Sequence, residues 1–145
     1  MVLTERKEHI ELLAKMMTDK GIKVVELHGG ISTKQRQERI TLLSSKPSND
    51  EPVVILATGK YVGEGFDLPH LDTLFITLPI AWKGILAQYA GRIQREWSNK
   101  TVIQVYDFID DFPTLQRMWK KREKGYKALG CKFNEQENLD FLSNP

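Results

Sequence analysis

Short apolar, β-branched runs alternate along the chain with stretches of helical periodicity, and this alternation restricts the fold more than any other feature. The runs cover residues 24–27, 53–57, 73–78 and 102–106. The run Val53–Ala57 is apolar at every position, as expected for a strand buried on both faces of a sheet. Alternating strands and helices predict a parallel sheet with right-handed crossovers and with helices on both faces. The sequence therefore predicts a three-layer α/β domain.

Apolar spacing and typical end residues mark the helices. Ser32–Gln35 has the composition of a capping box, which begins a helix. Pro near the first turn and Gly after the end mark the last helix. Val2–Thr4 resembles the tail of a strand, so we expect the chain to begin inside an element. The predicted helices are the stretch containing Ile10, Leu13 and Met17 up to Gly21, the stretch that opens at Ser32, residues 82–95 and residues 113–129.

The composition is that of a soluble globular domain. Of the 145 residues, 41% are hydrophobic and 28% are charged, with a net charge of +2. A charge this small does not by itself indicate nucleic-acid binding. Cys131 is the only cysteine, which excludes an intramolecular disulfide and fits a reducing cytoplasmic compartment. No apolar run approaches the roughly 20 residues that span a bilayer, and the scattered histidines lack the spacing of metal ligands, so we expect neither membrane nor metal binding.

The segment after the second apolar run combines polar side chains with glycines. Residues 57–69 follow the run directly, and two glycines flank Glu64, so the backbone can turn sharply there. At the end of a strand, the Thr58 hydroxyl, free amides and the Asp67 carboxylate suit contacts to phosphate and ribose. A tight connection capped by Asp67 and Pro69 is the alternative interpretation.

The helix predicted over residues 82–95 has two unlike faces. Gln88, Arg92 and Arg95 share one face at about 100° per residue. Gly91 in the helix interior costs roughly 1 kcal/mol relative to Ala, which suggests that another backbone or a ligand comes close. A solvated charged face with surface salt bridges is the alternative. The opposite, apolar face consists of Leu86, Tyr89, Ala90 and Ile93.

Together these stretches resemble the second RecA-like domain of superfamily-two helicases and translocases, over residues 4–122. The glutamine, glycine and two arginines of residues 88–95 are similar to the family's motif VI, and residues 57–69 to its motif V. His28-Gly29 and the following helix look like the motif IVa region. The resemblance assigns catalytic roles to Gln88, Arg92 and Arg95, nucleotide contacts to Gly65, Asp67 and Gly91, and nucleic-acid contacts to Thr58, His28, Gly29 and Arg36.

The resemblance implies that ATP and Mg²⁺ bind between two RecA-like domains and are held mainly by the first. Neither the Gly-x-x-x-x-Gly-Lys-Ser/Thr loop nor the Walker B acidic motif of that first domain occurs here. We therefore expect an N-terminal RecA-like domain elsewhere in the full-length protein, and no ATP hydrolysis by this chain alone. Arg92, with Arg95, would reach the γ-phosphate, because a guanidinium is planar, always charged and bidentate.

The residues at the motif positions favour DNA as the partner, with RNA not excluded. Glu64 to Pro69 and the glutamine at position 88 look more like restriction-enzyme motor subunits and excision-repair helicases than DEAD-box RNA helicases. Two departures are present. The spacing from Thr58 to Asp67 is longer by one residue than in the family versions compared, and Thr33 stands where many members have Gln.

Several alternatives stay open. The chain could be a non-catalytic RecA-like module that binds nucleic acid or protein. A dinucleotide-binding enzyme is disfavoured, because Gly29-Gly30 lacks the Gly-x-Gly-x-x-Gly spacing. The basic residues between 120 and 127 could form a second nucleic-acid patch, but a solvated face is the preferred interpretation. We expect one domain over residues 1–130 and a polar tail or linker over 131–145.

Overall fold

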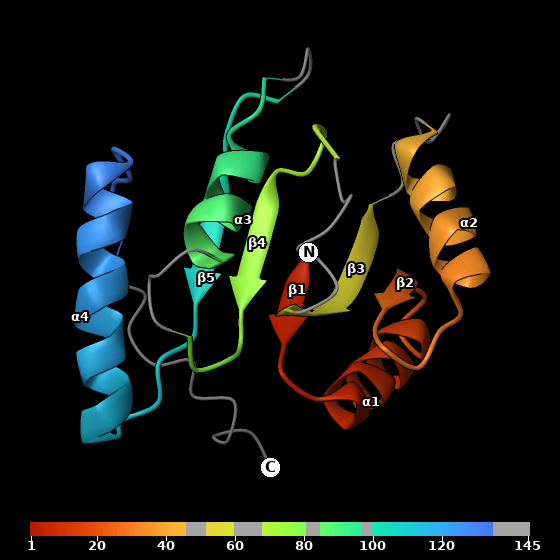
Figure 1. The fold of residues 1–145 in the computed structure, drawn as a ribbon, viewed down its shortest axis with the longest axis horizontal. Coiled ribbons are helices and arrows are strands. Elements are labelled where there is room, and N and C mark those ends of the chain that lie inside the picture. Colours follow the sequence, from red (N-terminus) through yellow and green to blue (C-terminus); the bar gives the residue numbers. More distant parts are fainter. Residues whose placement is uncertain (46–51, 60–67, 81–84, 97–99, 135–145) are drawn as a thin grey trace.

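The structure is a computed structural model that describes residues 1–45, 52–59, 68–80, 85–96 and 100–134. Strands and helices alternate, as the sequence predicts. In Figure 1, α1 and α2 lie beside β2 and β3, and α3 and α4 lie beside β4 and β5. The elements are β1 (Val2–Thr4), α1 (Lys7–Thr18), β2 (Lys23–Leu27), α2 (Thr33–Ser44), β3 (Val53–Thr58), β4 (Thr73–Ile76), α3 (Ile85–Ile93), β5 (Gln104–Asp107) and α4 (Pro113–Ala128).

The strands form a five-stranded sheet in the order β2-β3-β1-β4-β5. Each neighbouring pair is parallel, which confirms the predicted parallel sheet. The third and fourth apolar runs are shorter as strands than predicted. β5 begins at Gln104 because its amide is the first to reach the neighbouring chain, donating to the Asp72 carbonyl at 2.9 Å. β4 ends at Ile76, where Thr77 turns both its amide and its hydroxyl to the Leu3 carbonyl.

The two faces of the sheet are covered by different helices. Successive residues of a strand point to opposite faces, so Val2 packs against Ile10 of α1, while Leu3 belongs to the core on the other face. That second core also contains Leu86 of α3 and Tyr126 of α4. The helices therefore cover both faces, as the sequence predicts, and the three layers are those of a RecA-like domain.

The helix ends follow local chemistry. The Ser32–Gln35 capping box is present in full, which confirms the predicted start of α2. Gly21 and Gly130 both adopt positive φ after a helix, a conformation that glycine adopts without steric cost. α3 ends at Ile93, two residues before the predicted end, because the last turn tightens and the Arg95 amide bonds to the Arg92 carbonyl. Across the described ranges, every helix is too short or too polar to cross a bilayer.

The basic cluster of α4 is not one exposed face. Arg122 is only 3% exposed, whereas its lysine neighbours are exposed. Its guanidinium pairs with Asp107 of β5, so both expectations for this residue, a solvated position or a nucleic-acid patch, are wrong. Sequence spacing alone could not reveal the pairing, because the carboxylate lies on another element.

Leu56→Ala should lower the free energy of unfolding by about 2–5 kcal/mol, because the Leu56 side chain is fully buried and its removal leaves a cavity. Leu42→Ala is the matched control: Leu42 is 70% exposed, and its loss should change stability by less than about 0.5 kcal/mol. Urea unfolding of both variants measures the difference. Equal destabilisation would contradict the packing described here.

Candidate functional site

A hollow of about 570 Å³ lies at the carboxyl edge of the sheet. Four neighbouring strands contribute to it, each through the residues at or after its end. The hollow brings together His28, Gly29 and Thr58, three of the predicted nucleic-acid contacts. The remaining lining residues are Glu5, Lys7, Gly30, Gly59, Leu78, Ile80 and Tyr89.

The His28 ring points into its own turn. It is 6% exposed, and its Nδ1 accepts a hydrogen bond of 3.0 Å from the Gly30 amide. A ring that accepts at Nδ1 carries its proton on Nε2, and that atom lies 3.7 Å from the Glu26 carboxylate. Gly29, by contrast, is exposed. The imidazole therefore shapes the turn, and the surface of the turn is formed by the glycines.

Tyr89 connects the motif-like helix to the end of β3. Its ring is 1% exposed, on the predicted apolar face of α3. Its hydroxyl donates a hydrogen bond to the Gly59 carbonyl, the residue directly after Thr58. Burial raises the pKa of the Tyr89 hydroxyl, and the Arg92 guanidinium opposes that shift. Two stretches that the sequence singled out separately are thus in direct contact.

The two faces of α3 are confirmed. The predicted inner residues Leu86, Tyr89, Ala90 and Ile93 are all buried. On the other face, Gln88 is exposed and Arg92 is half-buried. Neither residue lines the hollow at the carboxyl edge. Arg95 lies just beyond the helix, so it departs from the regular helical spacing that placed it beside Arg92.

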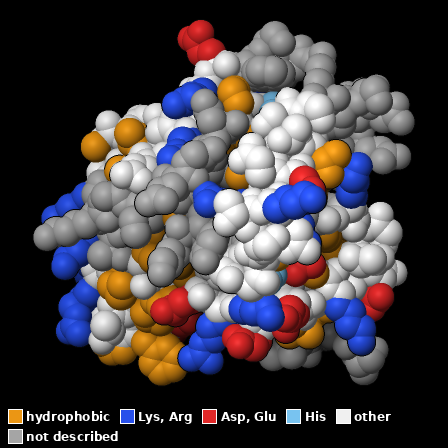
Figure 2. Space-filling view, turned by 45° about the vertical axis from the view of Figure 1, so that its right-hand side comes forward, with side chains coloured by type: hydrophobic (Ala, Val, Ile, Leu, Met, Phe, Trp, Pro, Cys, Tyr) orange, Lys and Arg blue, Asp and Glu red, His pale blue; other side chains and the backbone are white. Residues whose placement is uncertain are grey.

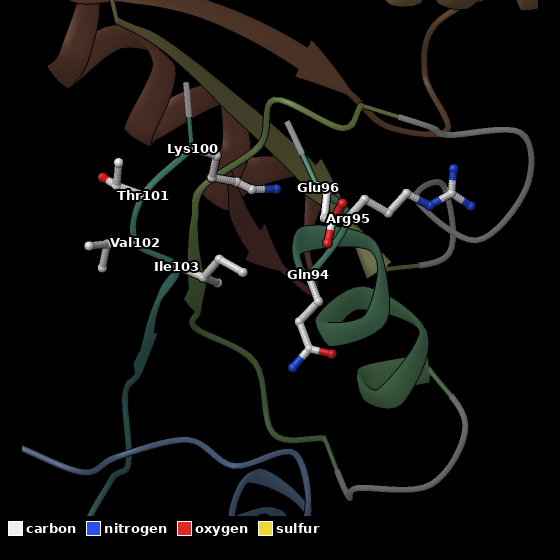
Figure 3. A pocket seen from close by; sticks show the side chains of 7 residues that line it. All are labelled: Gln94, Arg95, Glu96, Lys100, Thr101, Val102 and Ile103. Carbon is white, nitrogen blue, oxygen red and sulfur yellow. The ribbon is translucent and has the colours of Figure 1, made fainter. Parts of the chain in front are cut away.

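A second hollow, of about 680 Å³, lies at the opposite edge of the sheet, between the end of α3 and the residues before β5. Figure 3 shows Arg95 reaching away from Thr101 and Val102, on the other side of the helix end. Lys100 donates a 2.7 Å hydrogen bond to the Pro69 carbonyl. Burial lowers the pKa of Lys100, and the nearby Asp72 carboxylate partly offsets this lowering. This hollow is broad and lined by mixed side chains. None of the residues predicted to contact nucleic acid lines it.

The other predicted site residues are dispersed. Arg36 is half-buried on α2 and does not line either hollow. Gly65 and Asp67 lie outside the described residues. Gly91 is exposed, and a Cβ added there would meet no atom within 4 Å. The sequence reasoning missed Lys7, the first residue of α1, which lies three residues after the end of β1 and lines the hollow.

The charge distribution matches the small net charge. On the face that Figure 2 shows, Lys and Arg side chains are interspersed with Asp and Glu instead of gathering in one basic patch. Within the described part of the chain, no group of three or more His, Cys, Asp or Glu side chains could hold a metal ion.

Comparison with known protein families decides the identity of the fold. The family of helicase conserved C-terminal domains matches residues 1–97, which include β1 to β4 and all of α3. The chain belongs to this family. The fold resemblance inferred from the motifs is confirmed.

Relatives of this helicase C-terminal domain occur in viruses. It is 34% identical over 95 residues to the uncharacterized protein 108L of Invertebrate iridescent virus 3, covering 64% of this chain and 88% of 108L. It is 30% identical over 136 residues to protein 161L of Invertebrate iridescent virus 6, whose name provisionally calls it a helicase. That match covers 90% of this chain and 30% of 161L.

Solved structures share the fold of this helicase C-terminal domain. The C-terminal part of the Fun30 ATPase domain superposes with a TM-score of 0.66 at 13% identity, covering 99% of this chain and 42% of that one. T4 UvsW gives a TM-score of 0.66 at 20% identity, covering 88% of this chain and 28% of that one. The chain therefore spans less than half the length of each of these two structures.

Two glycines of the domain should respond to alanine with opposite signs. Gly30→Ala should destabilise it by about 1–3 kcal/mol, because the new Cβ would lie 3.0 Å from the buried His28 ring and from Lys7 Cε. Gly91→Ala should stabilise the isolated chain by roughly 0.5–1 kcal/mol, since Gly91 lies in a helix with open space around it. Thermal unfolding of both variants tests the pair, and destabilisation by Gly91→Ala would contradict the open environment described.

Proposed function

We propose that the chain is the second motor domain of an ATP-dependent nucleic-acid helicase or translocase. In this proposal the carboxyl-edge hollow holds the sugar–phosphate backbone, and α3 presents arginines to ATP bound on a first RecA-like domain. The observation that carries the proposal is the hydrogen bond from Tyr89 to Gly59, which joins the two regions. A movement of α3 against the first domain would then be transmitted directly to the residues that bind the nucleic-acid backbone.

Arg92 is the residue proposed to act on the nucleotide. It projects from the face of α3 that does not dock on the sheet, and its half-buried position restricts its motion. A guanidinium stabilises the charge that spreads over a transferring phosphoryl group. We assign Arg95 and Gln88 supporting roles, because Arg95 lies past the helix end and Gln88 carries no charge.

The open space at Gly91 supports the same arrangement. An exposed glycine in a helix is costly, and no atom of the described residues would lie within 4 Å of a Cβ at this position. We propose that the first domain or its nucleotide approaches the backbone there. In the assembled motor Gly91→Ala would then slow hydrolysis, although it stabilises the isolated chain.

The strand contacts are proposed at the carboxyl edge. Thr58 offers a hydroxyl at the end of β3, and Gly29 offers exposed backbone after β2. Lys7 adds an ammonium group on the same side. Contacts of these types position a phosphate backbone without reading its sequence, as a motor requires. DNA is the strand that the motif wording favours, and RNA would be held by the same chemistry.

When bound, ATP would supply the phosphoryl group and Mg²⁺ would neutralise charge on it. Among the described residues, no group of three or more His, Cys, Asp or Glu side chains could hold a metal ion. We assign Mg²⁺ and the β- and γ-phosphates to the first domain. Gly65 and Asp67 remain proposed nucleotide contacts. The chain alone would then lack ATPase activity, and turnover would require the complete motor, meaning this chain together with the first domain.

Arg92→Ala in the complete motor should reduce kcat by about 10³- to 10⁵-fold, the loss typical of an arginine finger. ATP affinity and melting temperature should change little, because Arg92 would act on charge that develops during the reaction. Arg92→Lys should rescue little, since an ammonium cannot make the forked contact. Steady-state phosphate release alongside ATP binding measures these effects.

Arg117→Ala is the matched control, because Arg117 is an exposed arginine of α4 that hydrogen-bonds only locally, to Thr114. It should leave kcat unchanged. If Arg92→Ala keeps kcat within a few-fold of the parent, α3 presents only a solvated charged face and the catalytic role of Arg92 is wrong. ATP turnover by the isolated, highly purified chain that survives Arg92→Ala would also overturn the proposal.

The isolated chain should bind single- or double-stranded nucleic acid weakly, without sequence preference, and lose affinity as salt rises. Lys7→Ala should reduce the slope of log affinity against log salt by about 1, as expected for one lost phosphate contact. Lys20→Ala is the control, because Lys20 is exposed after α1, at the other end of that helix. Fluorescence anisotropy at several salt concentrations measures the slopes, and equal slopes for both variants would exclude Lys7 from the interface.

A further inference from the structure

A buried ion pair joins α4 to the sheet behind the candidate site. The side chains of Arg122 and Asp107 are 3% and 6% exposed. Arg122 Nε and Nη2 donate to the two oxygens of Asp107, both at 2.8 Å. The Tyr126 hydroxyl donates to the same carboxylate at 3.0 Å. We call Asp107, Arg122 and Tyr126 the α4 latch.

The third donor of the guanidinium reaches another part of the chain. Arg122 Nη1 donates to the Ile80 carbonyl at 2.5 Å. Ile80 follows β4 and lines the carboxyl-edge hollow. Its side chain packs against the core cluster that contains Leu86 and Tyr89 of α3. The latch therefore bonds directly to the backbone of a residue that lines the hollow.

Leu78 extends this connection to the end of β3. Leu78 Cδ1 and the Tyr89 hydroxyl both lie 3.6 Å from where a Cβ would stand on Gly59. The stretch from Leu78 to Ile80 is thus held between α4 on one side and the Tyr89–Gly59 contact on the other. A displacement of Ile80 would move the packing partners of α3.

Stability alone is a poor explanation for the α4 latch. Desolvating two charges is costly, and a buried pair can often be replaced by apolar side chains of similar volume without loss of stability. An apolar replacement would pack α4 on β5 equally well, but it would leave the Ile80 carbonyl without its donor. What only the guanidinium provides is a simultaneous link between α4, β5 and the backbone after β4.

We propose that Arg122 is a positioning residue: it holds Ile80, and through it α3 and the wall of the strand site, in the arrangement that the motor uses. The position of α4 would thereby be coupled to the arrangement of Arg92 and the strand contacts. The effect on turnover rests on the motor function proposed above, whereas the effect on α3 can be measured in this chain alone.

The first test is amide hydrogen exchange of the isolated chain at matched global stability. The apolar variant carries Asp107→Leu, Arg122→Met and Tyr126→Phe together, so that no member of the α4 latch is left buried without a partner. The milder variant is Arg122→Lys, which keeps the charge but cannot bond Asp107 and Ile80 together. Lys127→Ala is the control, because it removes an exposed ion pair on the same helix.

The α3 amides of both latch variants should exchange at least 10-fold faster than those of the parent, while α1 amides and the Lys127→Ala protein stay unchanged. Exchange that is unaltered across α3, or accelerated equally in every element, would overturn the proposal and leave the latch as an anchor for α4 only. If the apolar variant does not fold, Arg122→Lys gives the same decision.

The second test measures kcat in the complete motor. The apolar variant should lose at least 10-fold in kcat, with ATP affinity retained, at a temperature where its folded fraction equals that of the parent. A kcat that follows the folded fraction in every variant would contradict the positioning role. A parent motor without turnover would instead overturn the proposed function, and the exchange experiment would still decide whether Arg122 positions α3.

Discussion

The central position of β1 is the constraint on which the rest of the structure depends. Its three residues pair with β3 on one side, and Val2 and Leu3 also pair with β4 on the other side. Val2, Leu3 and Thr4 are all buried. A strand with neighbours on both edges and helices on both faces is buried, so its side chains must be uncharged and mostly apolar. Glu5 and Lys7, which follow the carboxyl end of β1, line the hollow, so the strand that organises the core also leads into the site.

The hollow is surrounded by backbone as much as by side chains. Glycines after β2 and β3 form parts of its wall, and two helices hold neighbouring carbonyl groups: Tyr89 that of Gly59 and Arg122 that of Ile80. Backbone carbonyls buried without a donor are costly. Pairing them with side chains of α3 and α4 therefore fixes the backbone at Gly59, directly after β3, and at Ile80, which follows β4. Loops held on a rigid sheet in this way are the usual place for binding groups.

Local signals in the sequence predicted much of this. The capping box at Ser32 needs only four residues, and the inner face of α3 needs only helical spacing, so both are readable without the fold. The strand ends were predicted less accurately, because they depend on pairing with neighbouring strands: the Thr77 and Phe108 amides still bond to Leu3 and Ile76 one residue past the ends of β4 and β5. The burial of Arg122 was missed for a related reason: its carboxylate partner is 15 residues away along the chain. A basic residue among lysines gives no sign of such a pairing.

The sequence by itself determined the order of the elements, the parallel sheet, the helicase C-terminal family and the residues that follow each strand. Those properties depend on periodicity and on short motifs, which act between residues a few positions apart. Only the tertiary structure decided that His28 turns into its own loop, that Tyr89 bonds to Gly59, and that Arg122 lies buried against Asp107. Each of these contacts joins polar groups that lose water when distant elements pack together. Burying such a group without a partner is costly, so the packing of the folded chain decides which groups pair.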